Sequence, residues 1–115
     1  SYLAQAREFE QAEVSEAMKP LVARAKAMAD KLEEATTRVK EAGDAAFHDI
    51  CARHLVEMAA DVIMLHLLIH NATANAELFE KSARVYANFS EAEVAKHLTF
   101  VMNLRPEDLA DYVQA

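Results

Sequence analysis

The chain has 115 residues, with a single glycine, two prolines and no tryptophan. A composition so rich in alanine and so poor in glycine excludes a sheet-rich fold and predicts one all-α domain. The net charge of −7 excludes a nucleic-acid surface, because binding phosphates needs clustered lysine and arginine.

The sequence predicts a soluble, cytoplasmic protein without membrane contact. Its single cysteine, Cys51, cannot form an internal disulfide and implies no oxidising compartment. Nothing resembles a signal peptide. The longest uncharged apolar run, residues 62–69, is interrupted by His66 and is far shorter than the ~20 residues of a membrane helix.

The N-terminal segment, residues 1–14, has the spacing of a helix. Its apolar residues at intervals of three and four are Tyr2, Leu3, Ala6 and Phe9. Pro20 disfavours helical geometry at the residue before it, so we expect a break between Ser15 and Pro20. Because the chain starts with Ser1 and enters this pattern at once, residues 1–14 are expected to lead in from a missing upstream part. Residues 15–115 are then expected to form a single helical bundle domain.

A first long helix is predicted from this break to Ala42. Its apolar seam alternates steps of four and three along Met18, Val22, Ala25, Ala29, Leu32, Thr36 and Val39. Gly43 suits the left-handed geometry of a C-terminal cap, and Asp44 offers an N-cap to the next helix. So short a connection predicts that the two helices are antiparallel neighbours.

Three further helices are predicted. They are Ala45 to Asn71, Ala76 to Asn88 and Glu91 to about Leu104. A loop at residues 71–75 with Asn75 as a cap separates the first two, and a capping box from Ser90 to Glu93 separates the last two. Pro106 starts a terminal turn. The predicted fold is therefore an antiparallel four-helix bundle with additional short helical segments at both ends.

The central helix carries the residues that are candidates for chemistry. On a helix that turns by about 100° per residue, His54, Glu57 and Asp61 share one stripe, whereas His66 and His70 lie roughly 120° to 160° away. The histidine pair has the spacing of two zinc ligands but lacks a third ligand and a neighbouring glutamate. The central helix is more simply explained by burial, with the stripe Leu55, Met58, Val62, Leu65 and Ile69 in the core.

The remaining candidates also lack the partners that catalysis requires. Cys51 lies one turn from His54, but no oxyanion cradle accompanies it, so a small buried thiol is expected. No glycine-rich loop is present to hold phosphates. We therefore predict no catalytic, cofactor-binding or metal-ligating residue. The carboxylates of the stripe are expected to pair with basic residues, with groups of the missing upstream part or with a second subunit. The basic candidates are Arg53, Arg84 and Lys96.

Two segments resemble the C-terminal extension of bacterial acyl-CoA dehydrogenases. They are "DICARHLVEMAADVIMLHLLIHNA" (49–72) and "FEKSARVYANFSEAEVAKHLTFV" (79–101), and the similarity extends over roughly residues 15 to 112. Members of that family are FAD-dependent enzymes that oxidise acyl-CoA thioesters to trans-2-enoyl-CoA. In them this part follows the flavin-binding catalytic core, which carries the glutamate that removes the α-proton.

The resemblance implies a structural or interaction domain of an oxidoreductase. FAD and acyl-CoA would bind the parent enzyme and not this fragment, which would be non-catalytic. Its partners would be the missing catalytic core of the same chain and possible further copies in a homo-oligomer. Two alternatives stay open: a free-standing helical module that binds a protein or an acyl ligand, and a bundle that carries a metal or cofactor.

Overall fold

The computed structural model describes residues 1–109, and the elements within them are all helical. They are α1 (Tyr2–Glu10), η1 (Glu16–Met18), α2 (Lys19–Ala42), α3 (Ala45–Ala74), α4 (Ala76–Asn103) and η2 (Pro106–Leu109). The two η elements are short 3₁₀ turns. The all-α prediction is confirmed.

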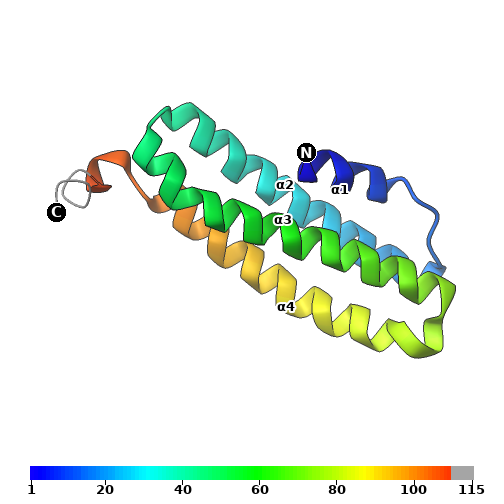
Figure 1. Cartoon of the computed structure of the whole chain (residues 1–115). Helices are drawn as coiled ribbons and strands as arrows, with labels where there is room; N and C mark the ends of the chain where they lie inside the picture. The colour runs from blue at the N-terminus through cyan, green and yellow to red at the C-terminus, as the bar shows by residue number, and fades with distance from the viewer. Residues whose placement is uncertain (110–115) are drawn as a thin grey trace.

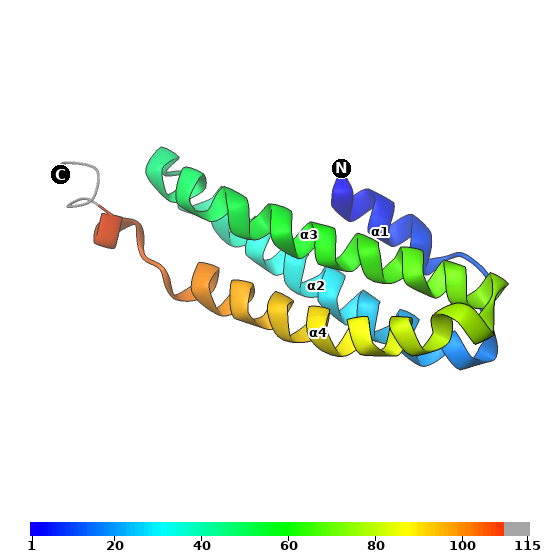
Figure 2. The ribbon, with the colours of Figure 1, turned by 60° about the horizontal axis from the view of Figure 1, so that its bottom comes forward.

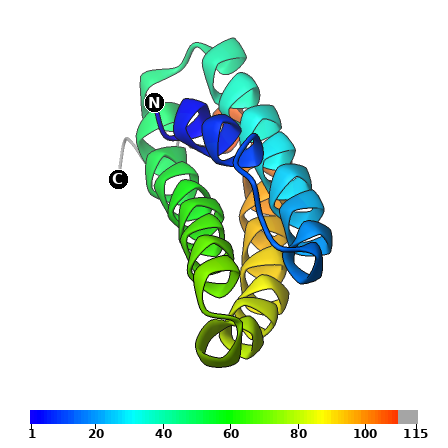
Figure 3. The same ribbon diagram turned by 90° about the vertical axis from the view of Figure 1, so that its right-hand side faces the viewer.

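The helices form an elongated bundle that measures 54 × 22 × 15 Å. Helices α2, α3 and α4 run along its length, each antiparallel to the next (Figures 1 and 2). The shorter α1 lies against α2 and α3 (Figure 3) and runs antiparallel to α2 (Figure 1). A bundle of four helices is therefore present as predicted, but its fourth helix is the short α1, whereas the prediction counted residues 76–88 and 91–104 as two helices.

Helix ends explain why these segments are helices of these lengths. Gly43 has a φ of 59° and ends α2 in the left-handed conformation that favours glycine. The Asp44 carboxylate accepts a hydrogen bond from the Phe47 amide at 2.8 Å, and the Asn75 side chain accepts one from the Leu78 amide at 3.2 Å. These three predicted caps are confirmed.

The predicted division between a third and a fourth helix is wrong. Helix α4 continues without a break through Phe89, Ser90 and Glu91. Ser90 is fully buried, and its hydroxyl donates to the Tyr86 carbonyl at 2.7 Å instead of capping a helix. A serine with a glutamate three residues later marks a helix start only where the backbone is free to leave the helix. Here the buried stripe of α4 continues across it, so packing overrides the local signal.

Two other boundaries also differ from the prediction. Helix α3 extends to Ala74, so residues 71–74 are helical and only Asn75 separates α3 from α4. The Thr73 hydroxyl donates to the Ile69 carbonyl at 3.0 Å and accepts from the Ser15 amide at 3.2 Å. Thr73 belongs to a polar segment that predicts a loop, yet its hydroxyl is hydrogen-bonded inside a helix. The first helix ends at Glu10, before the expected residue 14.

The core follows the predicted apolar stripes. Met58, Val62, Leu65 and Ile69 of α3 are buried, whereas Leu55 is only partly buried. In the predicted seam of α2, Val22 and Thr36 are likewise only partly buried. The other five residues of that seam are buried: Met18, Ala25, Ala29, Leu32 and Val39. The small alanines allow the helices to approach closely.

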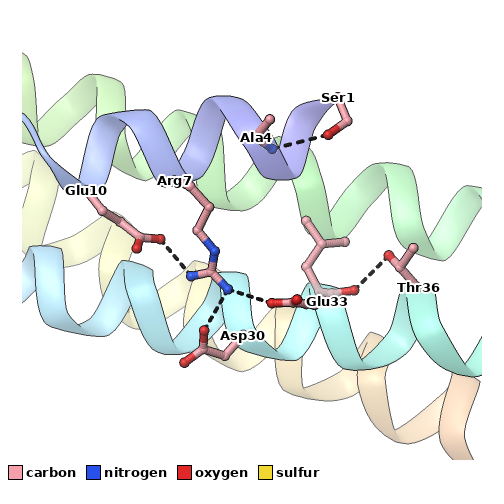
Figure 4. A network of polar contacts seen from close by, with 8 residues as sticks. Ser1, Ala4, Arg7, Glu10, Asp30, Glu33 and Thr36 are labelled. Carbon is pink, nitrogen blue, oxygen red and sulfur yellow. Dashed lines mark hydrogen bonds and ion pairs between the residues drawn. The ribbon is translucent and has the colours of Figure 1, made fainter.

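Two side chains attach α1 to the bundle. The Arg7 guanidinium bonds Asp30 at 2.7 Å and Glu33 at 2.9 Å on α2, and Glu10 at 2.9 Å on its own helix (Figure 4). Phe9 stacks on the ring of His66 of α3, with ring centroids 5.4 Å apart. The ion pairs of Arg7 and the stacking of Phe9, together with the buried Ala6, thus hold α1 over α2 and α3.

Within residues 1–109, α3 is the one helix long and apolar enough, by composition alone, to cross a membrane. The central helix of a folded core meets the same criteria. In this bundle α3 packs against α1, α2 and α4. That central place explains the buried apolar residues of α3, while Val56, Met64 and Leu67 on the same helix are exposed.

Candidate functional site: a polar cluster between α3 and α4

The main cluster of polar side chains lies where α3 and α4 face each other. His54 of α3 and His97 of α4 meet with their Nδ1 atoms 2.8 Å apart. His97 is only 4% exposed, and the ring of His54 also stacks on Phe100 with centroids 4.2 Å apart. One of the two Nδ1 atoms must donate and the other accept, so the tautomers of the two rings are complementary.

Carboxylates complete the cluster. His97 Nε2 lies 3.0 Å from Glu57 Oε2 and 3.9 Å from Glu93 Oε2. Arg53 Nε donates to the other oxygen of Glu57 at 3.1 Å. Lys96 pairs with Glu93 at 2.8 Å. The predicted pairing of the stripe with basic residues is confirmed for Glu57 and Arg53.

Asp61 and Tyr86 extend the cluster along the interface. The Tyr86 hydroxyl donates to Asp61 Oδ1 at 3.2 Å. Arg84, a predicted partner of the stripe, instead lies 3.5 Å from Glu80 on its own helix. Asp61 is thus matched by a neutral donor from α4, not by a cation.

Burial and neighbouring charges set the protonation of these groups. Burial, followed by the charge of His97, lowers the pKa of His54. The hydrogen bond from Arg53 lowers the pKa of Glu57. Burial raises the pKa of Asp61, and burial together with the charge of Asp61 raises the pKa of Tyr86 to about 12. At neutral pH the Tyr86 hydroxyl therefore keeps its proton and remains a donor.

The other candidate residues do not join this cluster. His66 is 2% exposed and lies under Phe9, whereas His70 is exposed, so the pair does not converge on one point. Cys51 is fully buried, and burial raises the pKa of its thiol. A buried thiol of raised pKa has little of the thiolate form that a nucleophile requires.

The cluster does not have the make-up of a metal or flavin site. Among residues 1–109, no group of three or more histidine, cysteine, aspartate or glutamate side chains is arranged to hold a metal ion. Gly43 caps α2 and lines no phosphate cradle. A polar hollow beside the segment between α1 and α2 is bordered by Glu10, Glu13, Glu16 and Lys19, and its three carboxylates outnumber the one lysine and repel phosphates. These residues do not fit FAD.

Comparison with known proteins decides the family. The family model described as acyl-CoA dehydrogenase C terminal matches residues 1–109. The chain belongs to this family. Its fold is also similar to the crystal structure of the acyl-CoA dehydrogenase family protein from Porphyromonas gingivalis. The TM-score is 0.85 at 35% sequence identity, and the alignment covers 91% of this chain and 90% of that chain. None of the curated proteins matches the chain.

In this acyl-CoA dehydrogenase C-terminal domain, the sequence alone predicts about half of the residues of the polar cluster. His54, Glu57 and Asp61 were identified as one stripe of α3, and the structure places all three against α4. Their partners His97, Glu93 and Tyr86 were missed, because one helix cannot show which residues face it. A signal was available in the spacing of Tyr86, Glu93 and His97, which recur at seven and four residues on one side of α4.

Proposed function

We propose that this chain is the non-catalytic C-terminal domain of an FAD-dependent acyl-CoA dehydrogenase. The catalytic core of that parent enzyme oxidises acyl-CoA to trans-2-enoyl-CoA and holds both the flavin and the substrate. The domain packs on this core or on a neighbouring subunit. In this proposal residues 1–14 lead in from the upstream core and pack on the single domain of residues 15–115, and the enzyme is cytoplasmic without membrane contact.

The observation that carries the proposal is the internal pairing of the polar cluster. Each ring nitrogen of His97 contacts another side chain of the bundle, and each oxygen of Glu57 has a partner. Asp61 accepts from Tyr86. Groups that are paired within the domain are poorly placed to bind or protonate a substrate, since that would require breaking these contacts. The cluster instead joins α3 to α4.

The outer surface supports a docking role. Large apolar side chains are exposed on α3 and on α4 and include Val56 at 57% and Val85 at 60%. Exposed apolar area is typical of a surface that contacts another protein. A domain that uses its polar groups internally and leaves apolar groups outside is suited to packing.

The proposal is tested by purifying the 115-residue chain and measuring its flavin absorbance and its dehydrogenase activity. We expect colourless protein without activity, whereas the parent enzyme carries flavin and turns over acyl-CoA. Yellow protein with a flavin spectrum would contradict the proposal. Titration calorimetry with an acyl-CoA separates the alternative of a free-standing acyl-ligand module, because saturable binding to the chain alone would favour that module.

A further inference from the structure

Helix α1 is the least embedded helix of the bundle. Ala6 is the one residue of α1 that is fully buried, whereas α2 buries seven residues and α3 buries nine. The helix lies on the outside of α2 and α3 (Figure 3), and residues 11–15, which connect it to the rest of the chain, are not helical. Local opening costs less free energy where few apolar groups are buried, so α1 can leave its place without unfolding the core.

A buried histidine lies under α1. His66 of α3 is 2% exposed, and its ring stacks on Phe9 of α1 with an angle of 11° between the ring planes. His66 Nε2 is buried and has no hydrogen-bond partner among the described residues. A protonated imidazole is a donor at both ring nitrogens, so the charged form of His66 would place a charge and an unpaired N–H in the interior. The docked position of α1 therefore favours the neutral form of His66.

Glu10 is the one charged group among the described residues whose charge acts on His66. Burial lowers the pKa of His66, and the negative charge of Glu10 only opposes this shift. Glu10 is itself bound to Arg7 at 2.9 Å. His70, one turn further along α3, is exposed to solvent. The charges of α1 and α3 therefore do not compensate fully for the burial of His66.

The other elements that pack on this part of α3 bring no counter-ion to His66. From η1, Glu16 is exposed and forms an ion pair with the start of α2. The buried stripe of α2 is wholly apolar. The one ionisable residue in the buried stripe of α4 is His97, which contacts His54, about 18 Å along α3 from His66. A protonated His66 therefore gains a partner only by reaching water, and α1 covers its ring.

The second attachment of α1 does not respond to mild acid. The Arg7 guanidinium binds Asp30 at 2.7 Å and Glu33 at 2.9 Å on α2 (Figure 4). Carboxylates that are paired with a guanidinium stay ionised between pH 5.5 and 7.5. Both carboxylates are more than half exposed, so these ion pairs hold α1 with modest strength. In this pH range acid therefore acts on the docking of α1 mainly at His66.

We propose that α1 is a pH-sensitive strap, which protonation of His66 releases from α2 and α3 while α2, α3 and α4 stay folded. Release allows the imidazolium to bind water, and deprotonation allows Phe9 to stack on the ring again. The ion pairs of Arg7 set how firmly the strap is held but not its response to pH. The inference goes beyond the proposed function and does not depend on it, because every contact involved lies within the bundle.

Amide hydrogen exchange of the 115-residue chain, measured residue by residue at pH 7.5 and 5.5, tests the strap. Each rate is compared with the intrinsic rate of an unfolded chain at the same pH, which gives a protection factor. At both pH values residues 5–10 should be less protected than the centre of α3. Their protection should fall by about three- to tenfold at pH 5.5. Tenfold is the ceiling, because the released state binds one extra proton with an ordinary pKa of about 6.5.

Three variants separate the two attachments of α1. His66→Phe keeps an aromatic ring under Phe9 and removes the titration, so the protection of residues 5–10 should be the same at both pH values. The matched control is His70→Phe, because His70 is exposed on the same helix and should keep the full pH response. Arg7→Gln should lower the protection of α1 by about two- to tenfold at each pH and leave the ratio between them unchanged.

Three results would overturn the strap. Equal protection of α1 and of the centre of α3 in the natural chain would show that α1 leaves only when the whole bundle unfolds. An α1 protection that does not change with pH in the natural chain would show that no titration releases it. A fall that is as large in His66→Phe as in the natural chain would show that another group drives the release. None of these results bears on flavin content or turnover, which test the proposed function separately.

Discussion

The Nδ1 atoms of His54 and His97 lie 2.8 Å apart across the interface of α3 and α4. A ring nitrogen accepts a hydrogen bond only when it carries no proton, so the contact requires at least one of the two rings to stay neutral. Glu57 faces His97 from the other side at 3.0 Å. Burial lowers the pKa of His54 in this contact, so protonation of its ring opposes folding.

Acid should destabilise the bundle through two histidines. Burial is the first cause of a lowered pKa at both His54 and His66; the charge of His97 adds to it at His54, while Glu10 opposes it at His66. Below about pH 6.5, the ordinary histidine pKa, the unfolded chain binds protons at these positions before the folded chain does. The two neutral histidines should therefore make their full contribution to the free energy of unfolding above that pH. This contribution should be lost as the pH is lowered. Urea melts at pH 7.5 and 5.5 measure the difference.

Replacing His66 by phenylalanine isolates the part of this pH dependence that comes from His66. His66 Nε2 is buried without a hydrogen-bond partner, and the ring stacks on Phe9. His66→Phe keeps an aromatic ring there and removes a buried polar group that costs about 1–3 kcal/mol. The variant should be at least as stable as the natural chain at pH 7.5 and should lose less stability at pH 5.5. An unchanged pH dependence would show that His66 does not titrate with folding.

Leu65 should be a major contributor to the core. It is fully buried in the middle of α3. Leu65→Ala is expected to lower the free energy of unfolding by about 2–5 kcal/mol, because it removes buried methyl groups and leaves a cavity. The control is Leu67→Ala, two residues away and 42% exposed, which should change stability by no more than about 0.5 kcal/mol. Equal losses in the two variants would contradict the observed burial.

Ser90 and Asn75 should behave differently when replaced by alanine. Asn75 caps α4, so Asn75→Ala should lose about 1 kcal/mol. Ser90 lies inside α4, where its hydroxyl only adds to carbonyls that the helix already uses. Ser90→Ala should therefore change the free energy of unfolding by less than about 0.5 kcal/mol, since alanine also favours helix. A larger loss at Ser90 than at Asn75 would argue for a helix start at Ser90.

Local signals in the sequence predicted the ends of helices better than the breaks within them. Gly43, Asp44 and Asn75 act as caps because the chain must leave a helix at those places. Ser90 carries an equally good capping signal, yet the buried stripe from Ala87 to Val94 holds the helix together. Packing of α4 against α2 and α3 decides whether the helix breaks at Ser90 or continues. A local sequence pattern carries no information about that packing.

Prediction of the candidate site from the sequence has the same limit. Spacing on α3 was enough to put His54, Glu57 and Asp61 on one stripe. The partners of that stripe come from α4, and the division of α4 into two predicted helices hid their common face. His97 contacts His54 across 43 residues of sequence, so only the pairing of α3 with α4 reveals it.

The central claim, that these residues support the enzyme without taking part in its chemistry, is tested by one measurement on the parent enzyme. Glu57→Gln together with Asp61→Asn removes the two carboxylates that contact His97 and Tyr86. Turnover of acyl-CoA per bound flavin should stay within about twofold of the natural enzyme, while stability or assembly is weakened. A loss of turnover of about a hundredfold, in a variant that keeps its flavin and its oligomeric state, would place the carboxylates in the active site and contradict the account.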